Sequence, residues 1–144
     1  MLNAAGQGHA LIGYYGRHRS LDTIASASLD KNICIWDLYT NTCQQKLRGH
    51  RLGVVSLAYC PAQRLLVSAG FDHDALVWSP FSSTVVSKLK GHNSSLVKVC
   101  RMGDESSTEL LTADVDGVFK IWDVRNFKCI QTFEGDLKKL VGFT

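Results

Sequence analysis

Three tryptophans recur at an almost constant interval along this chain, and that interval limits the fold more than any other feature. Trp36, Trp78 and Trp122 lie 42 and 44 residues apart. An aspartate stands six residues before each of them, within a polar segment such as the one in SLDKNICIWD, residues 28–37. Self-similarity at a fixed period of this size indicates a repeat architecture, in which each repeat is one supersecondary unit.

Two more positions belong to the same pattern. A serine or threonine stands four residues before each aspartate, and a Gly-His pair precedes that hydroxyl residue by 17 to 20 residues, counted from the histidine. The histidine, hydroxyl residue, aspartate and tryptophan of the three repeats are His9, Ser26, Asp30 and Trp36; His50, Ser68, Asp72 and Trp78; and His92, Thr112, Asp116 and Trp122. Four features in a fixed order, three times over, indicate one architecture used three times.

The local signals within each repeat all favour β-strands. Short runs such as NICIW, DALVW and VFKIW alternate with a period of two, and polar turn segments such as LDKN and FDHD separate them. Each repeat supplies four such runs, and no long window has the period of an amphipathic helix. Four short antiparallel strands in about 43 residues predict one blade of a β-propeller.

The ordered set of Gly-His, hydroxyl residue, turn aspartate and Trp-Asp resembles the WD40-repeat family, over about residues 8–136. The resemblance implies an all-β fold: a partial WD40 β-propeller of about three four-stranded antiparallel blades, with the start of a fourth. The predicted divisions are an N-terminal segment at 1–7, repeats at 8–48, 49–90 and 91–134, and the start of a further repeat at 135–144. The pattern departs from the family at Trp78-Ser79 and at Gly135-Asp136.

In this family the four repeated residues form a hydrogen-bonded chain within each blade, so the resemblance implies a structural role for all twelve. The chemistry agrees, because a buried indole N–H needs an acceptor and a buried imidazole needs a partner that fixes its tautomer. A Ser/His/Asp trio also occurs in hydrolases. We do not favour a catalytic site, because an enzyme needs one such trio and this chain has three equivalent ones.

The resemblance implies a non-enzymatic protein–protein interaction scaffold. In WD40 proteins, partners often contact the residue before each turn aspartate and the residues three and five after each Gly-His histidine. Those positions here are Leu29, Phe71 and Val115, then Gly53, Val55, Ser95 and Val97, with Ile12 and Tyr14 in the first repeat. A mostly apolar set suits a protein or peptide partner better than a phosphate group. The alternative is that several of these side chains pack inward.

A second hypothesis concerns the string Trp122-Asp123-Val124-Arg125, which resembles the motif by which some WD40 proteins dock on the adaptor of a cullin-RING ubiquitin ligase. Asp123 and Arg125 would then be docking residues of a substrate receptor. The alternative is a surface arginine that pairs with Asp123 or with solvent. A third hypothesis, an enzyme with a propeller domain, has no supporting residues in this sequence.

Composition excludes several other classes. The net charge of +3 is too small to predict nucleic-acid binding, and no apolar run approaches 18 residues, so we expect neither a membrane span nor a signal peptide. Five widely spaced cysteines predict reduced thiols rather than disulfides or a metal site. We therefore expect an intracellular, cytoplasmic protein, with a nuclear or ciliary location as the alternatives. We expect no cofactor. Because three blades leave two faces uncovered, we expect a fragment of a larger propeller or self-association.

Overall fold

A computed structural model describes residues 9–11, 16–18 and 21–135 of the chain, with side chains from residue 23 onward. Every regular element in the described part is a β-strand, which confirms the predicted all-β class. None of the described residues forms a helix that is long and apolar enough to cross a membrane. The start of a fourth repeat, predicted at 135–144, lies outside the described residues except for Gly135.

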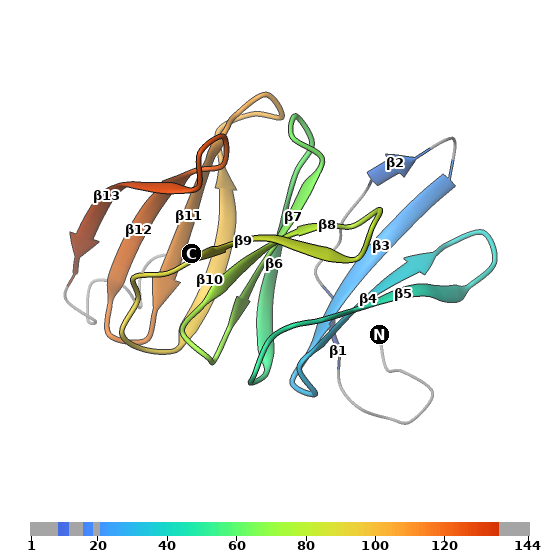
Figure 1. The fold of residues 1–144 in the computed structure, drawn as a ribbon, viewed down its shortest axis with the longest axis horizontal. Helices are drawn as coiled ribbons and strands as arrows, with labels where there is room; N and C mark the ends of the chain where they lie inside the picture. Colours follow the sequence, from blue (N-terminus) through green and yellow to red (C-terminus); the bar gives the residue numbers. More distant parts are fainter. Residues whose placement is uncertain (1–8, 12–15, 19–20, 136–144) are drawn as a thin grey trace.

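The strands form three antiparallel sheets that follow one another along the sequence and lie side by side (Figure 1). We call them blades 1, 2 and 3. Blade 1 contains β1 (His9–Leu11), β2 (Gly16–His18), β3 (Leu21–Ser28), β4 (Asn32–Asp37) and β5 (Thr42–Arg48). Blade 2 contains β6 (Val54–Cys60), β7 (Leu65–Gly70), β8 (Ala75–Ser79) and β9 (Thr84–Leu89). Blade 3 contains β10 (Leu96–Met102), β11 (Glu109–Asp114), β12 (Val118–Asp123) and β13 (Lys128–Glu134).

Blades 2 and 3 are four-stranded meanders, as the sequence predicts, whereas blade 1 differs at its first strand. There, β1 pairs with residues 26–28 of β3, and β2 pairs with residues 21–23 of the same strand. Two short strands therefore take the place that β6 and β10 fill in the other blades. Of the segment YYGRHRS, residues 14–20, the structure describes residues 16–18, which form β2.

The tight turns between the second and third strands share one backbone conformation. Lys31, His73 and Gly117 occupy equivalent positions and have φ values of 80°, 71° and 84°. This left-handed region is the one that short hairpin turns require. In the first of these turns, the Asp30 carboxylate accepts a hydrogen bond of 3.0 Å from the Asn32 amide, which is a local contact typical of aspartate in turns.

The third and fourth strands of each blade share a β-bulge at the tryptophan. The register shifts fall between residues 35 and 36, 77 and 78, and 121 and 122. A bulge adds one residue to one strand and turns the side chains that follow. Because all three blades have it at the same place, their residues can be compared position by position.

Two apolar cores lie between the blades, one on each side of blade 2. In each blade we call the side that carries the tryptophan the tryptophan face, and the other side the opposite face. Between blades 1 and 2 the largest core residues are Ile33, Ile35 and Leu47 from one side and Leu66, Leu76 and Trp78 from the other. Between blades 2 and 3 they include Val67, Val77 and Leu89 from one side and Leu96, Leu110 and Trp122 from the other. The opposite face of one blade thus packs on the tryptophan face of the next.

Candidate functional site

A buried hydrogen-bonded chain crosses blade 2. The indole Nε1 of Trp78 donates to Ser68 Oγ over 2.8 Å, and His50 Nε2 lies 2.6 Å from the same oxygen. On the other side of the ring, His50 Nδ1 lies 3.1 Å from both carboxylate oxygens of Asp72. A neutral imidazole satisfies every group, because Nδ1–H donates to the carboxylate while Nε2 accepts from the Ser68 hydroxyl.

Blade 3 contains the same chain, but the structure corrects one of its members. Trp122 Nε1 donates to Thr112 Oγ1 over 2.8 Å, and His92 Nε2 lies 2.7 Å from that oxygen. The carboxylate that contacts His92 Nδ1, at 2.7 Å, belongs to Asp114. We predicted Asp116 for this place from its distance to the tryptophan. Asp116 is instead exposed.

The space around Gly70 explains this difference. Gly70 in blade 2 is the positional equivalent of Asp114. A Cβ at Gly70 would lie 2.5 Å from His50 Nδ1 and would overlap the Asp72 carboxylate. A carboxylate can therefore reach the histidine from either of two positions, but not from both. Where the earlier position has an acidic side chain, that side chain fills the space and the later aspartate stays outside.

Blade 1 has only part of this arrangement in the described side chains. Trp36 Nε1 donates to Ser26 Oγ over 2.9 Å, as in the other blades. The side chain of His9 lies outside the described part, so its predicted role stays a prediction. Asp30 is exposed, and because its predicted partner His9 has no described side chain, its part in the chain also stays a prediction; buried Ser28 stands at the position of Asp114. Ser28 Oγ accepts a hydrogen bond of 3.1 Å from the Asp30 amide.

Burial and hydrogen bonding together set the protonation states of the histidines and aspartates in these hydrogen-bonded chains. Burial lowers the pKa of His50 and of His92, although the neighbouring carboxylates act in the other direction. For Asp72 burial raises the pKa, but the hydrogen bond from the Arg51 amide and the contact with His50 outweigh it, so the net pKa is lowered. The pKa of Asp114 is lowered in the same way, mainly through its hydrogen bond with His92. A neutral histidine beside an ionised aspartate follows in both blades.

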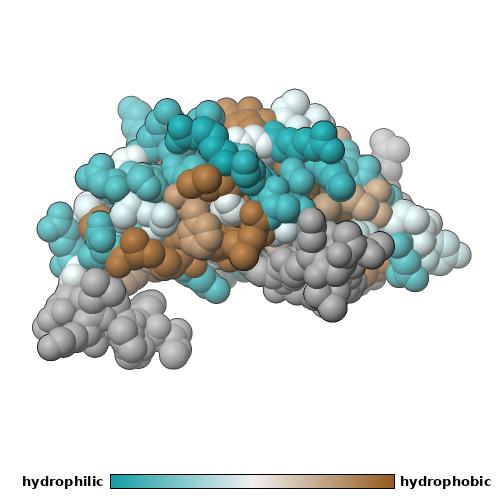
Figure 2. Space-filling model, turned by 90° about the horizontal axis from the view of Figure 1, so that it is seen from below, coloured by the Kyte–Doolittle hydropathy of each residue, from teal (hydrophilic) through white to brown (hydrophobic). Residues whose placement is uncertain are grey.

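The predicted partner residues gather at one end of the blades. Leu29, Phe71 and Val115 lie in the turns after β3, β7 and β11, and their exposed fractions are 64%, 37% and 44%. Val97, at the start of β10, is 44% exposed. Figure 2 views the molecule from this end, and hydrophobic residues gather in its middle. We call these four side chains and the turns that carry them the turn surface.

Contacts between neighbouring turns join the turn surface into one row. The Phe71 amide donates to the Gly53 carbonyl oxygen over 2.9 Å, and the Val115 amide donates to the Ser95 carbonyl oxygen over 3.0 Å. Between blades, Ser95 Oγ donates to the Phe71 carbonyl oxygen over 3.0 Å. Gly53 lies against Leu29 of blade 1, since a Cβ there would be 3.0 Å from Leu29 Cδ2. These contacts hold the exposed apolar side chains in fixed relative positions.

The other predicted partner positions contribute less surface. Gly53 is buried, and Val55 and Ser95 are half-buried. Gly53 and Ser95 therefore contribute mainly through the backbone and hydroxyl contacts that position the turn surface. Ile12 and Tyr14 lie outside the described residues. The inward-packing alternative thus fails for the four exposed apolar side chains, whereas Val55 and Ser95 are partly covered.

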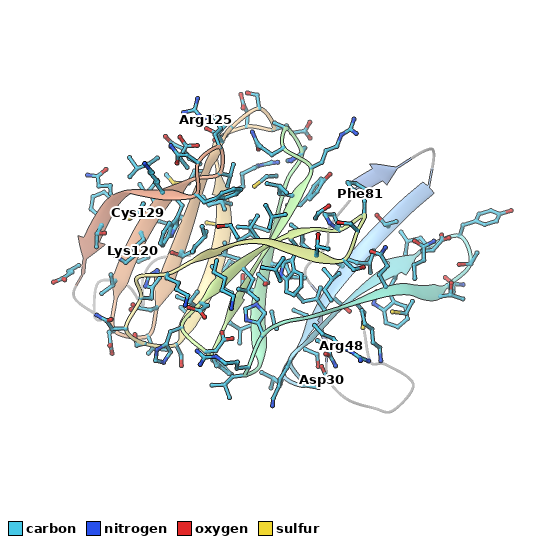
Figure 3. The ribbon with its side chains drawn as sticks, in the orientation of Figure 1. Asp30, Arg48, Phe81, Lys120, Arg125 and Cys129 are labelled. Carbon is cyan, nitrogen blue, oxygen red and sulfur yellow. The ribbon has the colours of Figure 1, made fainter. Side chains whose placement is uncertain are left out.

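Arg125 lies at the far end of the molecule from Asp30 (Figure 3). Its guanidinium Nη2 lies 2.8 Å from Asp123 Oδ2, and its Nε is 3.1 Å from Asp123 Oδ1. The Arg125 side chain is 69% exposed, whereas that of Asp123 is 10% exposed. Hydrogen bonds from Arg125 lower the pKa of Asp123. The arginine is thus held in one direction by an ionised, mostly buried carboxylate.

The described cysteine and acidic side chains do not group into a ligand cluster. All five thiols are free, and burial raises the pKa of Cys34 and of Cys60 to about 11. Within the described ranges, no group of three or more His, Cys, Asp or Glu side chains is arranged to hold a metal ion.

Comparison with known proteins identifies the repeats. The family model described as WD domain, G-beta repeat, matches residues 10–37, 41–79 and 83–123. The chain belongs to the WD40-repeat family. Proteins with WD40 repeats generally serve as scaffolds for protein interactions and are typically non-catalytic.

One curated relative is the WD repeat-containing protein pop2 of Schizosaccharomyces pombe. It is 36% identical to this WD40 chain over 61 residues, which is 40% of this chain and 9% of pop2. The chain therefore matches only a small part of that protein's length, and the likeness supports the repeat assignment alone.

Proposed function

We propose that this WD40 chain is a non-enzymatic scaffold whose protein or peptide partner binds the turn surface. The observation that carries the proposal is the row of exposed Leu29, Phe71, Val97 and Val115 at one end of three packed blades. Exposed large apolar side chains that stand together, rather than singly, mark interaction sites. The hydrogen bonds between the turns keep this surface organised before a partner arrives, which reduces the entropy lost on binding.

Two observations favour a scaffold over an enzyme or a phosphate-binding protein. The Ser68 hydroxyl is fully buried and already contacts both Trp78 and His50, so a substrate cannot reach it. The turn surface is centred on four apolar side chains, and the turns that carry them hold one exposed lysine, Lys31, beside two exposed aspartates, Asp30 and Asp116. Apolar side chains offer no cation to a nucleic-acid backbone, whose binding depends on lysine and arginine.

The burial of the tryptophans supports a larger propeller. Trp78, between two blades, is fully buried, whereas Trp36, on the side of blade 1 that no described blade covers, is half-buried. A blade buries its faces only against neighbouring blades, and propellers close with roughly four to eight of them. The three blades accordingly form part of a ring that further blades complete. The free thiols favour an intracellular, cytoplasmic site for this assembly.

The experiment that tests the turn surface is partner capture with a matched control. A photo-reactive amino acid at position 29 identifies a crosslinked protein in cells, and the purified protein is then titrated against this chain by calorimetry. Phe71→Ser combined with Val115→Ser should weaken that binding at least about tenfold, because it removes two apolar anchors. Tyr39→Ser is the control, since Tyr39 is 87% exposed and lies outside the turn surface. Equal affinities for both variants would reject the proposal.

A second proposal is a substrate receptor of a cullin-RING ubiquitin ligase that docks through Arg125. The exposed guanidinium, held in one direction by Asp123, favours it, because a pre-oriented arginine loses little entropy on binding. Arg125→Ala should abolish co-purification of the ligase adaptor with this chain. Arg64→Ala, another exposed arginine, serves as the control. Adaptor binding that survives Arg125→Ala would exclude this route.

A further inference from the structure

The turns that carry the turn surface are acidic. Their sequences are SLDKN at residues 28–32, GFDHD at residues 70–74 and DVDG at residues 114–117. These segments hold five aspartates and one lysine, although the net charge of the whole chain is +3. In Figure 2, hydrophilic residues border the hydrophobic ones at this end of the molecule. The exposed apolar row thus stands on turns whose charge is opposite to that of the chain.

Three of the five aspartates have partners within the chain. Asp72 and Asp114 are buried and contact the histidines of the buried hydrogen-bonded chains. Asp74 is half-buried, and its Oδ2 lies 3.9 Å from Arg51 Nη2. The other two aspartates are exposed: Asp30 and Asp116. These two carboxylates are the ones that a binding partner can reach.

Asp116 gives the turn of blade 3 a charge that no described cation balances. It directly follows Val115 of the turn surface, and its amide donates to Asp114 Oδ1 over 3.0 Å. Its carboxylate forms no ion pair with a described residue. The ionised Asp114 carboxylate places a second negative charge in the same short turn. A cation that reaches Asp116 is therefore attracted by both carboxylates.

The turn of blade 1 differs, because Lys31 follows Asp30 and both are exposed. Asp30 Oδ1 also accepts a hydrogen bond of 3.0 Å from the Asn32 amide. Another exposed cation, Lys98, follows Val97, but it forms no ion pair with a described carboxylate. The negative charge of the turns is therefore least balanced at the blade 3 end of the row.

We propose that the partner of the turn surface is a peptide segment that combines apolar side chains with a lysine or arginine. The apolar side chains lie on the row formed by Leu29, Phe71 and Val115, and the cation pairs with Asp116. This inference rests on the binding site proposed above and adds the chemistry of its partner. A charge at one end of an apolar row also decides in which direction the peptide lies, since complementary charges fix the register of an interface.

The apolar row and the carboxylate have different parts in this interaction. An exposed ion pair contributes little free energy by itself, so the apolar side chains provide most of the affinity. The carboxylate provides selectivity, because an acidic or phosphorylated segment would bring like charges together beside Asp114 and Asp116.

Selection from a library of random short peptides, displayed and captured on the full chain, tests the chemistry of the partner. We expect the enriched peptides to contain more lysine and arginine than the unselected library, next to apolar residues. Non-specific attraction to a chain of net charge +3 would instead enrich aspartate and glutamate. An excess of basic residues therefore reports a local acidic site rather than the charge of the whole molecule.

Charge variants then place the cation. For the most enriched peptide, calorimetry should show binding weakened about two- to threefold by Asp116→Asn and at least about fivefold by Asp116→Lys, which replaces an attraction by a repulsion. Glu105→Lys is the matched control, since Glu105 is exposed in the loop between β10 and β11, outside the turn surface. It changes the net charge by the same amount and should alter the affinity by less than about twofold.

A selection that enriches no sequence, or one without an excess of basic residues, would overturn the basic partner. Equal affinities of the Asp116→Lys and Glu105→Lys chains for the selected peptide would also overturn it. The double variant Phe71→Ser with Val115→Ser separates this result from the site itself. Binding that this double variant weakens and Asp116→Lys does not would leave the turn surface as the site and reject only the basic partner. Binding that neither changes would reject both proposals.

Discussion

Replacement of Ser68 by alanine should be among the most costly small substitutions in this WD40 chain. The Ser68 hydroxyl is fully buried at the centre of blade 2. It accepts the Trp78 indole N–H over 2.8 Å and lies 2.6 Å from His50 Nε2. Ser68→Ala removes one oxygen atom and leaves both of these buried groups without that partner, although it makes almost no cavity.

The magnitude follows from the two groups that lose their hydrogen bonds. A buried polar group left unsatisfied costs about 1–3 kcal/mol, so the two groups together should lower the free energy of unfolding by about 2–6 kcal/mol. For a chain of this size that corresponds to a melting temperature lower by roughly 6–18 °C. Trp78 and His50 both belong to blade 2, which packs on both of its neighbours, so the loss should affect the whole cooperative unit.

Urea titration of the full chain at neutral pH measures this free energy. Ser82→Ala is the control, because its hydroxyl contacts only Thr84 Oγ1 on the exposed surface and its loss should cost less than about 0.5 kcal/mol. Ser68→Thr should recover most of the stability, since Thr112 makes the same two contacts in blade 3. A loss below about 1 kcal/mol for Ser68→Ala, with an unchanged urea slope, would refute the reasoning.

Three further predictions concern the buried hydrogen-bonded chains of blades 2 and 3. Asp114→Ala should lower the free energy of unfolding by about 2–3 kcal/mol, whereas Asp116→Ala should change it by less than about 0.5 kcal/mol; equal effects in urea titrations would contradict the assignment of Asp114. Gly70→Ala should cost about 1–3 kcal/mol by the same assay, because its Cβ would lie 2.5 Å from His50 Nδ1; a neutral result would mean that this space is not filled. Burial holds the pKa of His50 and His92 in the folded protein below 6.5, so the unfolded chain takes up protons first as the pH falls. The free energy of unfolding should therefore be level above about pH 7. It should decrease as the pH drops toward the pKa values of these histidines in the folded protein. Thermal melts at about pH 8 and pH 5.5 that agree within error would reject this pH dependence.

Local patterns were enough to predict the blades and part of each buried chain. Trp36, Trp78 and Trp122 each donate to a hydroxyl ten residues earlier, and this contact lies within one hairpin. Turn length fixes the register of a hairpin, and the register fixes which side chains share a face. Residues that meet across a single hairpin can therefore be read from their spacing.

The acidic partner of the histidine could not be assigned by spacing alone. His92 comes from the segment before the first strand of its blade, and it meets Asp114 only when the whole sheet is assembled. The sequence has two aspartates close together, Asp114 and Asp116, and either could be the partner of His92. The choice depends on whether the residue equivalent to Gly70 carries a side chain that fills the space beside the imidazole. The sequence TADVDG has an acidic residue, Asp114, at the position of Gly70. This residue predicts the assignment once it is known that its side chain and that of the later aspartate compete for the space beside the imidazole.

By itself the sequence determined the repeat, the strands, the turns and the partners of each tryptophan, because these depend on contacts within about 40 residues of chain. Only the tertiary structure decided which faces are covered. Val77 and Ile121 occupy equivalent positions in nearly identical strands, yet the first is fully buried and the second is not. That difference arises because a neighbouring blade packs on one of them, and burial is a property of the neighbours a residue meets rather than of the residue.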